Sequence, residues 1–406
     1  MSERAQNILV ISLAILLPIL TFVAGFMTNE VFDMSLPFTK ESSQLISDAD
    51  SAGFDLFWEA WGHIEETYIG DVPTGRNLTY AAIQGALVSL NDPYSRFLEP
   101  VVRQEEIVSL SGNYGGIGVY VKRNEIGEAW LIPIPNNPAA EAGVEEGDIL
   151  LEINDETVSG DLSISQIEQL LRGEVGDDLE LTLDRNGKVI ELEIVIGQIL
   201  VPSVFARILS EAPAIGYIQL SRFSAETSEE LEKAILNFET KGVKGIILDL
   251  RGNGGGLLDA SVEVADHFLE DGIILRQESR SEGEKIYNAH SGSVAADIPT
   301  VVLMDAGTAS AAEIVAGALQ DQSRALLIGT KSYGKGSVQL VYDLSDGSSI
   351  HVTSARWFTP NGTQIDQQGL FPDVPVDLVA ASEDLNKDYF IQTGIDNLSK
   401  ILEAAN

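Results

Sequence analysis

The C-terminal half of the chain alternates between short apolar strands and amphipathic helices, and no other feature limits its possible folds as much. In chain order we predict strand 215–219, helix 227–240, strand 246–250, helix 258–269, strand 301–304 and helix 310–321. Apolar strands that alternate with helices are typical of sheets covered by helices. The sequence therefore predicts that this part of the chain forms α/β layers.

The length and composition set further limits. At 406 residues the chain exceeds what one hydrophobic core usually fills, so we expect more than one domain. It has 25 basic and 62 acidic residues and a net charge of −37. Because this charge repels nucleic acid, we expect no nucleic-acid partner. The absence of cysteine excludes disulfides, thiolate catalysis and cysteine-ligated metal. No histidine pair has the spacing of a zinc site, so we expect neither a metal nor another cofactor.

The N-terminus carries a long apolar run. Residues 8–27 contain no charged side chain, and about 20 apolar residues suffice to cross a bilayer as a helix. We predict that residues 1–27 form a transmembrane anchor, with Arg4 on the cytoplasmic side and Glu30 outside. A cleaved signal peptide is the alternative, although Val23-Ala24-Gly25 is a poor cleavage site. The expected location is the plasma (inner) membrane, with a single span and the rest of the chain outside the cytoplasm.

A linker and a helical segment are expected after the anchor. Residues 28–52 lack a sustained apolar period and are predicted to be the linker, and residues 53–103 are predicted to be mainly helical. Apolar side chains recur at helical spacing at Phe54, Phe57, Trp58, Trp61 and Ile64. Such a stripe usually packs in a core, and we expect it to do so here.

A strand-rich segment follows at residues 104–197. It opens with a glycine turn that contains Ile117, Gly118 and Val119, and the run from Asn137 to Asn154 comes later in the segment. In this order the two pieces resemble a PDZ domain. The resemblance implies that the amides of Ile117, Gly118 and Val119 bind a peptide C-terminal carboxylate while the peptide adds a strand to the sheet. The alternative is a domain retained for packing alone.

Ser310 follows a predicted strand and begins an apolar helix. The N-terminus of a helix presents unpaired N–H groups and a partial positive charge. The amide of Ala311 could therefore stabilise an oxyanion that forms when the Ser310 hydroxyl attacks a carbonyl. The alternative is that Ser310 only caps the helix, because serine is preferred at that position.

Lys335 and Gln339 follow in the run Gly-Lys-Gly-Ser-Val-Gln. A lysine can deprotonate a serine near neutral pH only if burial or another cation lowers its pKa. Lys335 and Gln339 should share one face of an extended strand, where the glutamine could hold the amine. The alternative is a surface lysine beside a polar glutamine.

The glycine-rich loop 249–257 joins a predicted buried strand to a helix. We expect the amide of Gly255 or Gly256 to be a second oxyanion donor, with Arg251 and Asn253 bracing the turn. The loop lacks the Gly-Lys-Ser/Thr ending of a phosphate-binding loop, so nucleotide binding is disfavoured.

Taken together, these motifs resemble the carboxyl-terminal processing peptidases of the S41 serine protease family. The motifs that match are Asp92–Ser95, the loop 249–256, Ser310 with its neighbours, Lys335 with Gln339, and the runs Phe358–Gly362 and Gly369–Asp373. The resemblance implies an α/β fold with a crotonase-like protease core at residues 198–380, an inserted PDZ domain and a C-terminal helical tail at residues 381–406.

The resemblance also implies residue roles. Ser310 would be the nucleophile, Lys335 the general base and Gln339 the residue that positions the lysine. Arg172 matches a family arginine that relays peptide occupancy to the active site. The histidines lie in no motif like that of Lys335 and are not expected to be catalytic; they are His63, His267, His290 and His351.

Our interpretation is a membrane-anchored serine endopeptidase that binds protein C-termini through its PDZ domain and cleaves them through an acyl-enzyme. The expected partners are protein or peptide substrates with free C-termini, and a homo-oligomer or an activating adaptor remains open. One alternative is a catalytically silent PDZ adaptor at the membrane. The other is crotonase-like chemistry on acyl-thioesters, in which Lys335 would have no role.

Overall fold

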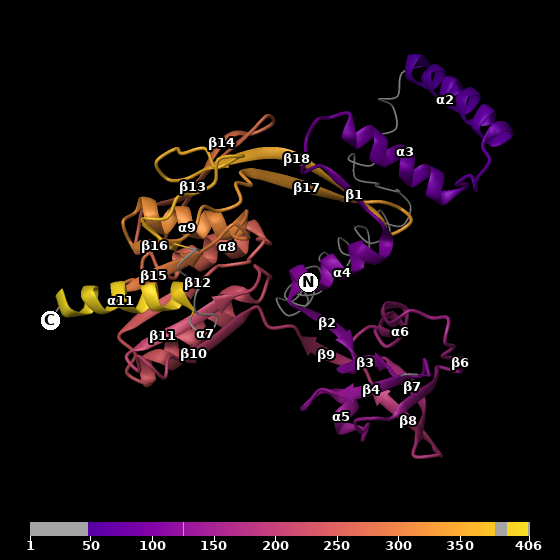
Figure 1. Cartoon of the computed structure of the whole chain (residues 1–406), viewed down its shortest axis with the longest axis horizontal. Helices are drawn as coiled ribbons and strands as arrows, with labels where there is room; N and C mark the ends of the chain where they lie inside the picture. The colour runs from indigo at the N-terminus through magenta and orange to yellow at the C-terminus, as the bar shows by residue number, and fades with distance from the viewer. Residues whose placement is uncertain (1–47, 125, 378–387, 405–406) are drawn as a thin grey trace, which may run out of the picture. The chain divides into compact units, whose positions relative to one another are not determined.

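The computed structural model describes residues 48–124, 126–377 and 388–404 (Figure 1). The chain divides into an N-terminal unit that ends at Thr79 and a larger unit that begins at Tyr80. The predicted anchor and the predicted linker up to residue 47 lie outside the described residues. No helix in those described ranges combines the length and the apolar character that a membrane span requires.

The described part of the N-terminal unit is helical. Helix α2 (Asp48–Thr67) includes the last residues of the predicted linker, and helix α3 (Arg76–Val88) begins in this unit. The aromatic helix is confirmed, but the burial expected for its stripe is wrong within this unit. Phe54 is 62% exposed and Trp58 is 57% exposed, so these two side chains are not buried by the part of the unit that the structure describes.

The larger unit is built on a sheet whose strands lie in the order β10-β11-β12-β15-β16-β19. The strands are β10 (Val204–Ile208), β11 (Ile215–Leu220), β12 (Gly245–Asp249), β15 (Thr300–Met304), β16 (Ala325–Gly329) and β19 (Val374–Pro375). Strand β10 pairs antiparallel with β11, and the other neighbours are parallel. The predicted α/β alternation is confirmed.

Helices cover both faces of this sheet (Figure 1). They are α7 (Thr227–Thr240), α8 (Leu258–Asp266), α9 (Ala311–Asp321) and α11 (Tyr389–Ala404). Successive side chains of a strand point to opposite faces. Ile246 and Leu248 of β12 accordingly pack in the core that contains residues of α7, α8 and α9, whereas Ile247 packs with Leu398 of α11.

The parallel pairing of β12 with β15 places the loops that follow them at one edge of the sheet. The glycine loop, which we define as residues 250–256, follows β12, and the turn that contains Ser310 follows β15. The sheet therefore brings together two motifs that lie far apart in the sequence.

A second, antiparallel sheet carries Gln339, and the loop with Lys335 leads into it. It contains β1 (Arg96–Leu98), β13 (Ile273–Ser279), β14 (Gly283–Asn288), β17 (Ser337–Asp343) and β18 (Ser349–Phe358). Helix α4 (Pro100–Ser111) follows β1. The short strands β2 (Asn113–Gly116) and β9 (Gly197–Leu200) then pair at the entry to and exit from the strand-rich segment.

The strand-rich segment has a core of its own, in which Leu131 and Leu183 are fully buried. Its strands are β3 (Val119–Arg123), β4 (Ala129–Pro133), β5 (Ile149–Ile153), β6 (Glu156–Thr157), β7 (Asp178–Arg185) and β8 (Lys188–Val195), and its helices are α5 (Pro138–Glu141) and α6 (Ile164–Leu170). Strand β3 lies at an edge of the sheet, where a further strand could be added.

Candidate active site

Ser310 lies on the turn between β15 and α9, and its backbone is strained. Its φ of 54° and ψ of −118° fall in a region that residues with a side chain rarely occupy. A serine that only caps a helix ordinarily has extended backbone angles, so capping by itself does not account for this conformation. The Ser310 N–H donates to Oε2 of Glu313 at 2.9 Å, which holds the turn in this form.

A cleft of about 560 Å³ opens beside this turn, and we call it the central cleft. Its lining includes every catalytic and oxyanion residue predicted from the sequence: Ser310, Ala311, Gly255, Gly256, Lys335 and Gln339. The two sheets contribute different members, since the glycine loop and Ser310 follow parallel strands, whereas Gln339 lies on β17. The cleft therefore has the residue types that nucleophilic attack on a carbonyl requires.

The glycine loop lies directly against the Ser310 turn. A Cβ at Gly255 would come within 2.8 Å of the Ser310 Cβ and 3.1 Å of the Ala311 nitrogen, so only glycine permits this approach. The Gly255 N–H donates to Oδ1 of Asn253 at 2.9 Å, and the buried Asn253 amide donates to the Leu220 carbonyl at 2.9 Å. Asn253 therefore braces the loop as expected, and it occupies the Gly255 amide in doing so.

Gly256 also requires the absence of a side chain. Its φ is 150°, and a Cβ there would lie 2.1 Å from the Phe223 carbonyl oxygen. That carbonyl accepts the Leu257 N–H, whereas the Gly255 carbonyl accepts the Phe223 N–H. Among the residues that the structure describes, the Gly256 N–H has no backbone acceptor, and neither has the Ala311 N–H.

Lys335 is partly buried in the wall of the central cleft. Burial lowers the pKa of the Lys335 amine and the positive charge of Arg96 lowers it further, although nearby carboxylates, first Glu106, oppose both effects. The Tyr94 ring faces the lysine, with its centroid 5.7 Å from Nζ, and the Tyr94 hydroxyl donates to the Gly334 carbonyl at 3.3 Å. The Asp92–Ser95 motif thus supports the loop that carries the lysine.

Gln339 lines the same cleft from strand β17. Lys335 precedes β17, so the expected sharing of one strand face by Lys335 and Gln339 does not hold. The register with β18 shifts beside Gln339, where Ser354 of β18 is the extra residue of the bulge. The Gln339 amide donates to the hydroxyl of Ser337 at 2.8 Å.

Glu313 is a buried carboxylate that joins the turn at Ser310 to the loop that carries Lys335, and the sequence motifs did not single it out. Its Oε2 accepts the N–H groups of Ser310 and Lys335, both at 2.9 Å. Its Oε1 accepts the Gly334 N–H at 2.8 Å and the Ser332 hydroxyl. Burial raises the pKa of Glu313 even though these hydrogen bonds favour the carboxylate. The available signal was an acid within the apolar run of residues 311–319.

Helix α4 and strand β18 close another side of the central cleft. His351, on β18, is buried in this wall, and its Nε2 lies 3.0 Å from Oε2 of Glu106 on α4. Burial alone would raise the pKa of Glu106, but the contacts with His351 and Arg103 hold it below its usual value. Among the described residues, no three histidine or acidic side chains are grouped closely enough to hold a metal ion.

The strand-rich segment has a separate groove of about 150 Å³ beside the edge strand β3. Its lining includes all three predicted carboxylate-binding residues and Arg172: Tyr114, Ile117, Gly118, Val119, Tyr120, Ile134, Glu168, Leu171 and Arg172. The Arg172 guanidinium carbon lies 4.7 Å from the Tyr114 ring centroid. The backbone of Arg172 forms an isolated antiparallel β-bridge with Gly116 of β2. A groove next to a free strand edge is suited to an added peptide strand.

Comparisons with known proteins match both parts of the chain. The family model described as peptidase family S41 matches residues 214–376, and the model described as PDZ domain matches residues 133–185. The chain is 35% identical to a carboxy-terminal-processing protease of Bartonella bacilliformis over 88% of its own length and 82% of the relative. It is also 35% identical to the carboxy-terminal processing protease CtpA of Bacillus subtilis, over 85% of this chain and 74% of the relative.

Among solved structures, the chain is similar to one titled photosystem II D1 C-terminal processing protease. The two are 33% identical, the match covers 80% of this chain and 89% of the other, and the TM-score is 0.45.

Proposed function

Since the chain belongs to the S41 family of carboxy-terminal-processing serine peptidases and contains a PDZ domain, we propose that its Ser310 and Lys335 form the catalytic dyad of an endopeptidase. One observation carries the proposal: a single cleft is lined by Ser310, Lys335, Gln339, Ala311 and Gly256. A catalytically silent adaptor has no support, because the relatives are proteases.

Lys335 acts first as a general base and then as a general acid. The neutral amine takes the proton of the Ser310 hydroxyl while Oγ attacks the carbonyl carbon of the scissile peptide bond. The C–N bond then breaks, the Lys335 ammonium returns the proton to the leaving amine, and an ester joins Ser310 to the substrate. Water attacks that ester while the Lys335 amine takes its proton. The bond between the acyl carbon and Ser310 Oγ then breaks, the Lys335 ammonium returns the proton to Oγ, and the carboxylic acid leaves. The lowered pKa of Lys335 supports this role, since an ordinary amine stays protonated near neutral pH.

The amides of Ala311 and Gly256 stabilise the oxyanion that forms during the attack. Gly256 is preferred over Gly255 because the Gly255 N–H already donates to Asn253. Gln339 orients the Lys335 amine through its side-chain oxygen, as the third member of a triad does.

The PDZ groove selects the substrate. A protein C-terminus adds to β3 as a strand, and its carboxylate binds the amides of Ile117, Gly118 and Val119. Arg172 then relays groove occupancy to the central cleft. The placement of Arg172 in this groove supports that role.

A transmembrane helix within residues 1–27 anchors the enzyme, with the catalytic body outside the cytoplasm. The uncharged run of residues 8–27 supports this part of the proposal. Extraction of the full chain from membranes by carbonate at high pH, without detergent, would contradict the anchor.

The test of the dyad compares the full chain in detergent with its Ser310→Ala and Lys335→Ala variants on an unfolded protein. Lys331→Ala is the matched control, because Lys331 is an exposed lysine of the same loop. We expect cleavage to fall by at least about 100-fold in both dyad variants and not in the control. A fluorophosphonate should label the wild type on Ser310. Undiminished cleavage by both dyad variants would overturn the proposal.

A further inference from the structure

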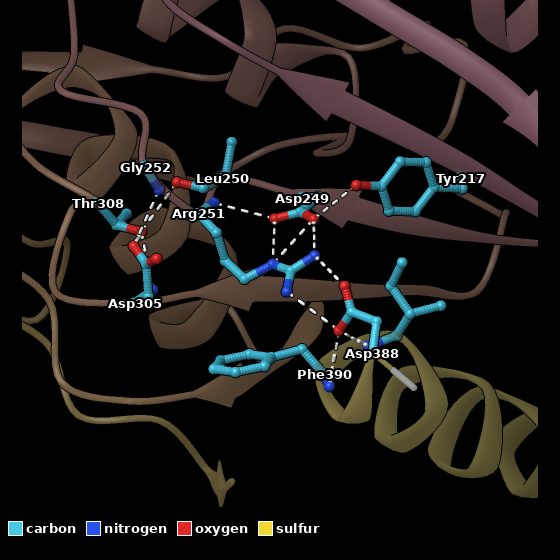
Figure 2. A network of polar contacts seen from close by, with 10 residues as sticks. Tyr217, Asp249, Leu250, Arg251, Gly252, Asp305, Thr308, Asp388 and Phe390 are labelled. Atoms are coloured by element: carbon cyan, nitrogen blue, oxygen red, sulfur yellow. Dashed lines mark hydrogen bonds and ion pairs between the residues drawn. The ribbon is translucent and has the colours of Figure 1, made fainter. Parts of the chain in front are cut away.

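The C-terminal helix reaches the base of the glycine loop through a polar network that runs from the buried Asp249 to the exposed Asp388 (Figure 2). The network starts at Asp249, the last residue of β12, whose side chain is almost fully buried. Asp249 accepts the Tyr217 hydroxyl at 2.7 Å, and it accepts both Nε and the backbone N–H of Arg251 at 2.9 Å. Asp249 therefore fixes one edge of the Arg251 guanidinium.

Asp388 fixes the other edge. Nη1 of Arg251 donates to Oδ1 of Asp388 at 3.1 Å, and Nη2 donates to Oδ2 at 3.0 Å (Figure 2). Paired parallel bonds of this kind set the direction of a guanidinium as well as its position. The Phe390 ring covers the guanidinium face, with its centroid 4.8 Å from Cζ. Arg251 is thus held from the C-terminal segment by a carboxylate and by an aromatic ring.

Asp388 is itself rigidly placed. Its Oδ1 accepts the backbone N–H groups of Phe390 and Ile391 at 3.0 and 3.1 Å, so Asp388 caps the first turn of α11. Helix α11 is anchored on the sheet by the buried Ile391 and Leu398. The carboxylate therefore transmits the position of a packed helix to Arg251.

Between Arg251 and the oxyanion donors, the glycine loop is held by hydrogen bonds at each of the next two residues. The next residue, Gly252, donates its N–H to Oδ1 of Asp305 at 2.9 Å, and Asp305 follows β15 at the start of the Ser310 turn. The Asn253 carbonyl accepts the Ala309 N–H at 2.9 Å, next to Ser310. The direction in which the loop leaves Arg251 thus affects the placement of both the loop and the nucleophile turn.

We infer that Asp388 is a positioning residue for the oxyanion hole, which it orients through Arg251 and the glycine loop. The C-terminal segment is then a working part of the active site and not an accessory tail. The family match ends at residue 376, so Asp388 lies beyond the part of the chain that the match covers. The inference rests on the proposed function, because it assigns the oxyanion donors to Ala311 and Gly256.

The test uses the full chain in detergent with the Asp388→Asn variant. Asparagine can still cap α11 through its side-chain oxygen, but it cannot form the charged pair with Arg251. Asp396→Asn is the matched control, since Asp396 is exposed on the same helix and accepts only a Gln392 hydrogen bond at 2.8 Å among the described residues. The measurements are kcat and KM on a fluorogenic peptide, the melting temperature, and the affinity of a peptide aldehyde of the same sequence, whose adduct with serine resembles the tetrahedral intermediate.

We expect kcat of Asp388→Asn to fall by about 10- to 100-fold, less than the loss when an oxyanion donor is removed outright. Affinity for the aldehyde should weaken by the same factor, while KM and the melting temperature stay close to those of Asp396→Asn. A merely structural role would lower the melting temperature without this match between kcat and aldehyde affinity.

Wild-type kcat and aldehyde affinity in Asp388→Asn would overturn the inference, and so would an equal loss in Asp396→Asn. If Asp388→Asn does not fold, the Phe390→Leu variant tests the inference instead, because it keeps the Asp388 carboxylate and removes the ring over Arg251. Phe390→Leu should then show the same parallel loss of kcat and aldehyde affinity, and its absence would contradict us. Failure of the dyad itself is distinguishable, since it would appear as retained cleavage by Ser310→Ala.

Discussion

Replacement of Glu313 by glutamine tests how strongly one buried carboxylate holds the active site together. Four donors end on this carboxylate, and the amide of glutamine keeps one oxygen and so only two of the four bonds. Hydrogen bonds to a charged acceptor contribute about 1.5–3 kcal/mol each, so the loss of two would cost about 3–6 kcal/mol. Burial already disfavours the charged form, as the raised pKa of Glu313 indicates, and the neutral amide avoids that cost. We therefore expect the free energy of unfolding to fall by about 2–4 kcal/mol in Glu313→Gln.

Activity should fall further than stability alone would require, because the new NH2 group faces at least one N–H donor in either orientation. In place of Oε2 it opposes the N–H groups of Ser310 and Lys335, and in place of Oε1 it opposes the Gly334 N–H, while the Ser332 hydroxyl can turn to accept from it. A displaced nucleophile or base should lower kcat by at least about 100-fold. Urea unfolding and peptide cleavage measure the two effects, with Glu263→Gln on the exposed face of α8 as control. A Glu313→Gln variant that matches the control in both measurements would refute the reasoning.

Three further outcomes are expected. Because the folded-state pKa of Lys335 is lowered from its usual 10.5, wild-type stability should rise with pH between that lowered value and 10.5. Lys335→Met should remove this rise and unfold at a higher temperature than wild type at pH 7, while losing at least about 100-fold in kcat/KM; a flat wild-type profile would contradict this. Gly256→Ala should lower the unfolding free energy by about 2–4 kcal/mol, since its Cβ would lie 2.1 Å from the Phe223 carbonyl, and unchanged urea unfolding would exclude the clash. Arg172→Ala should abolish stimulation of cleavage by an added C-terminal peptide and leave basal cleavage intact, so full stimulation would exclude the relay.

Local pattern predicted much of the fold because it reports secondary structure directly. The strands and helices from residue 215 to 321 can be predicted from side-chain periods of 2 and 3.6 residues alone. The structure contains those elements in that order. The aromatic stripe of α2 shows where the same argument fails. Its period correctly indicates a helix, but a period does not say whether another surface covers the apolar face, and Phe54 and Trp58 are exposed in their unit.

Some residues of the candidate site could be predicted from local sequence, and others could not. Ser310, Lys335 and the glycine loop are recognisable because each lies in a short motif whose residue types suit the chemistry. Lys335 lies before the strand that carries Gln339, so strand alternation could not predict that both residues line one cleft. His351 also lines this cleft, although its sequence neighbours give no sign of that position.

The sequence by itself therefore determined the α/β class, the family and the chemical types of the proposed catalytic groups, because propensity, period and short motifs are properties of neighbouring residues. Only the tertiary structure decided what holds those groups in place. Glu313 accepts the N–H groups of residues 310, 334 and 335. Asp388 accepts hydrogen bonds from Arg251, which lies 137 positions earlier in the sequence. A buried carboxylate such as Glu313 selects its partners by proximity in the folded core, where water cannot replace them, whereas the exposed Asp388 is placed by the helix that it caps. Both arrangements arise only when distant strands and helices pack together.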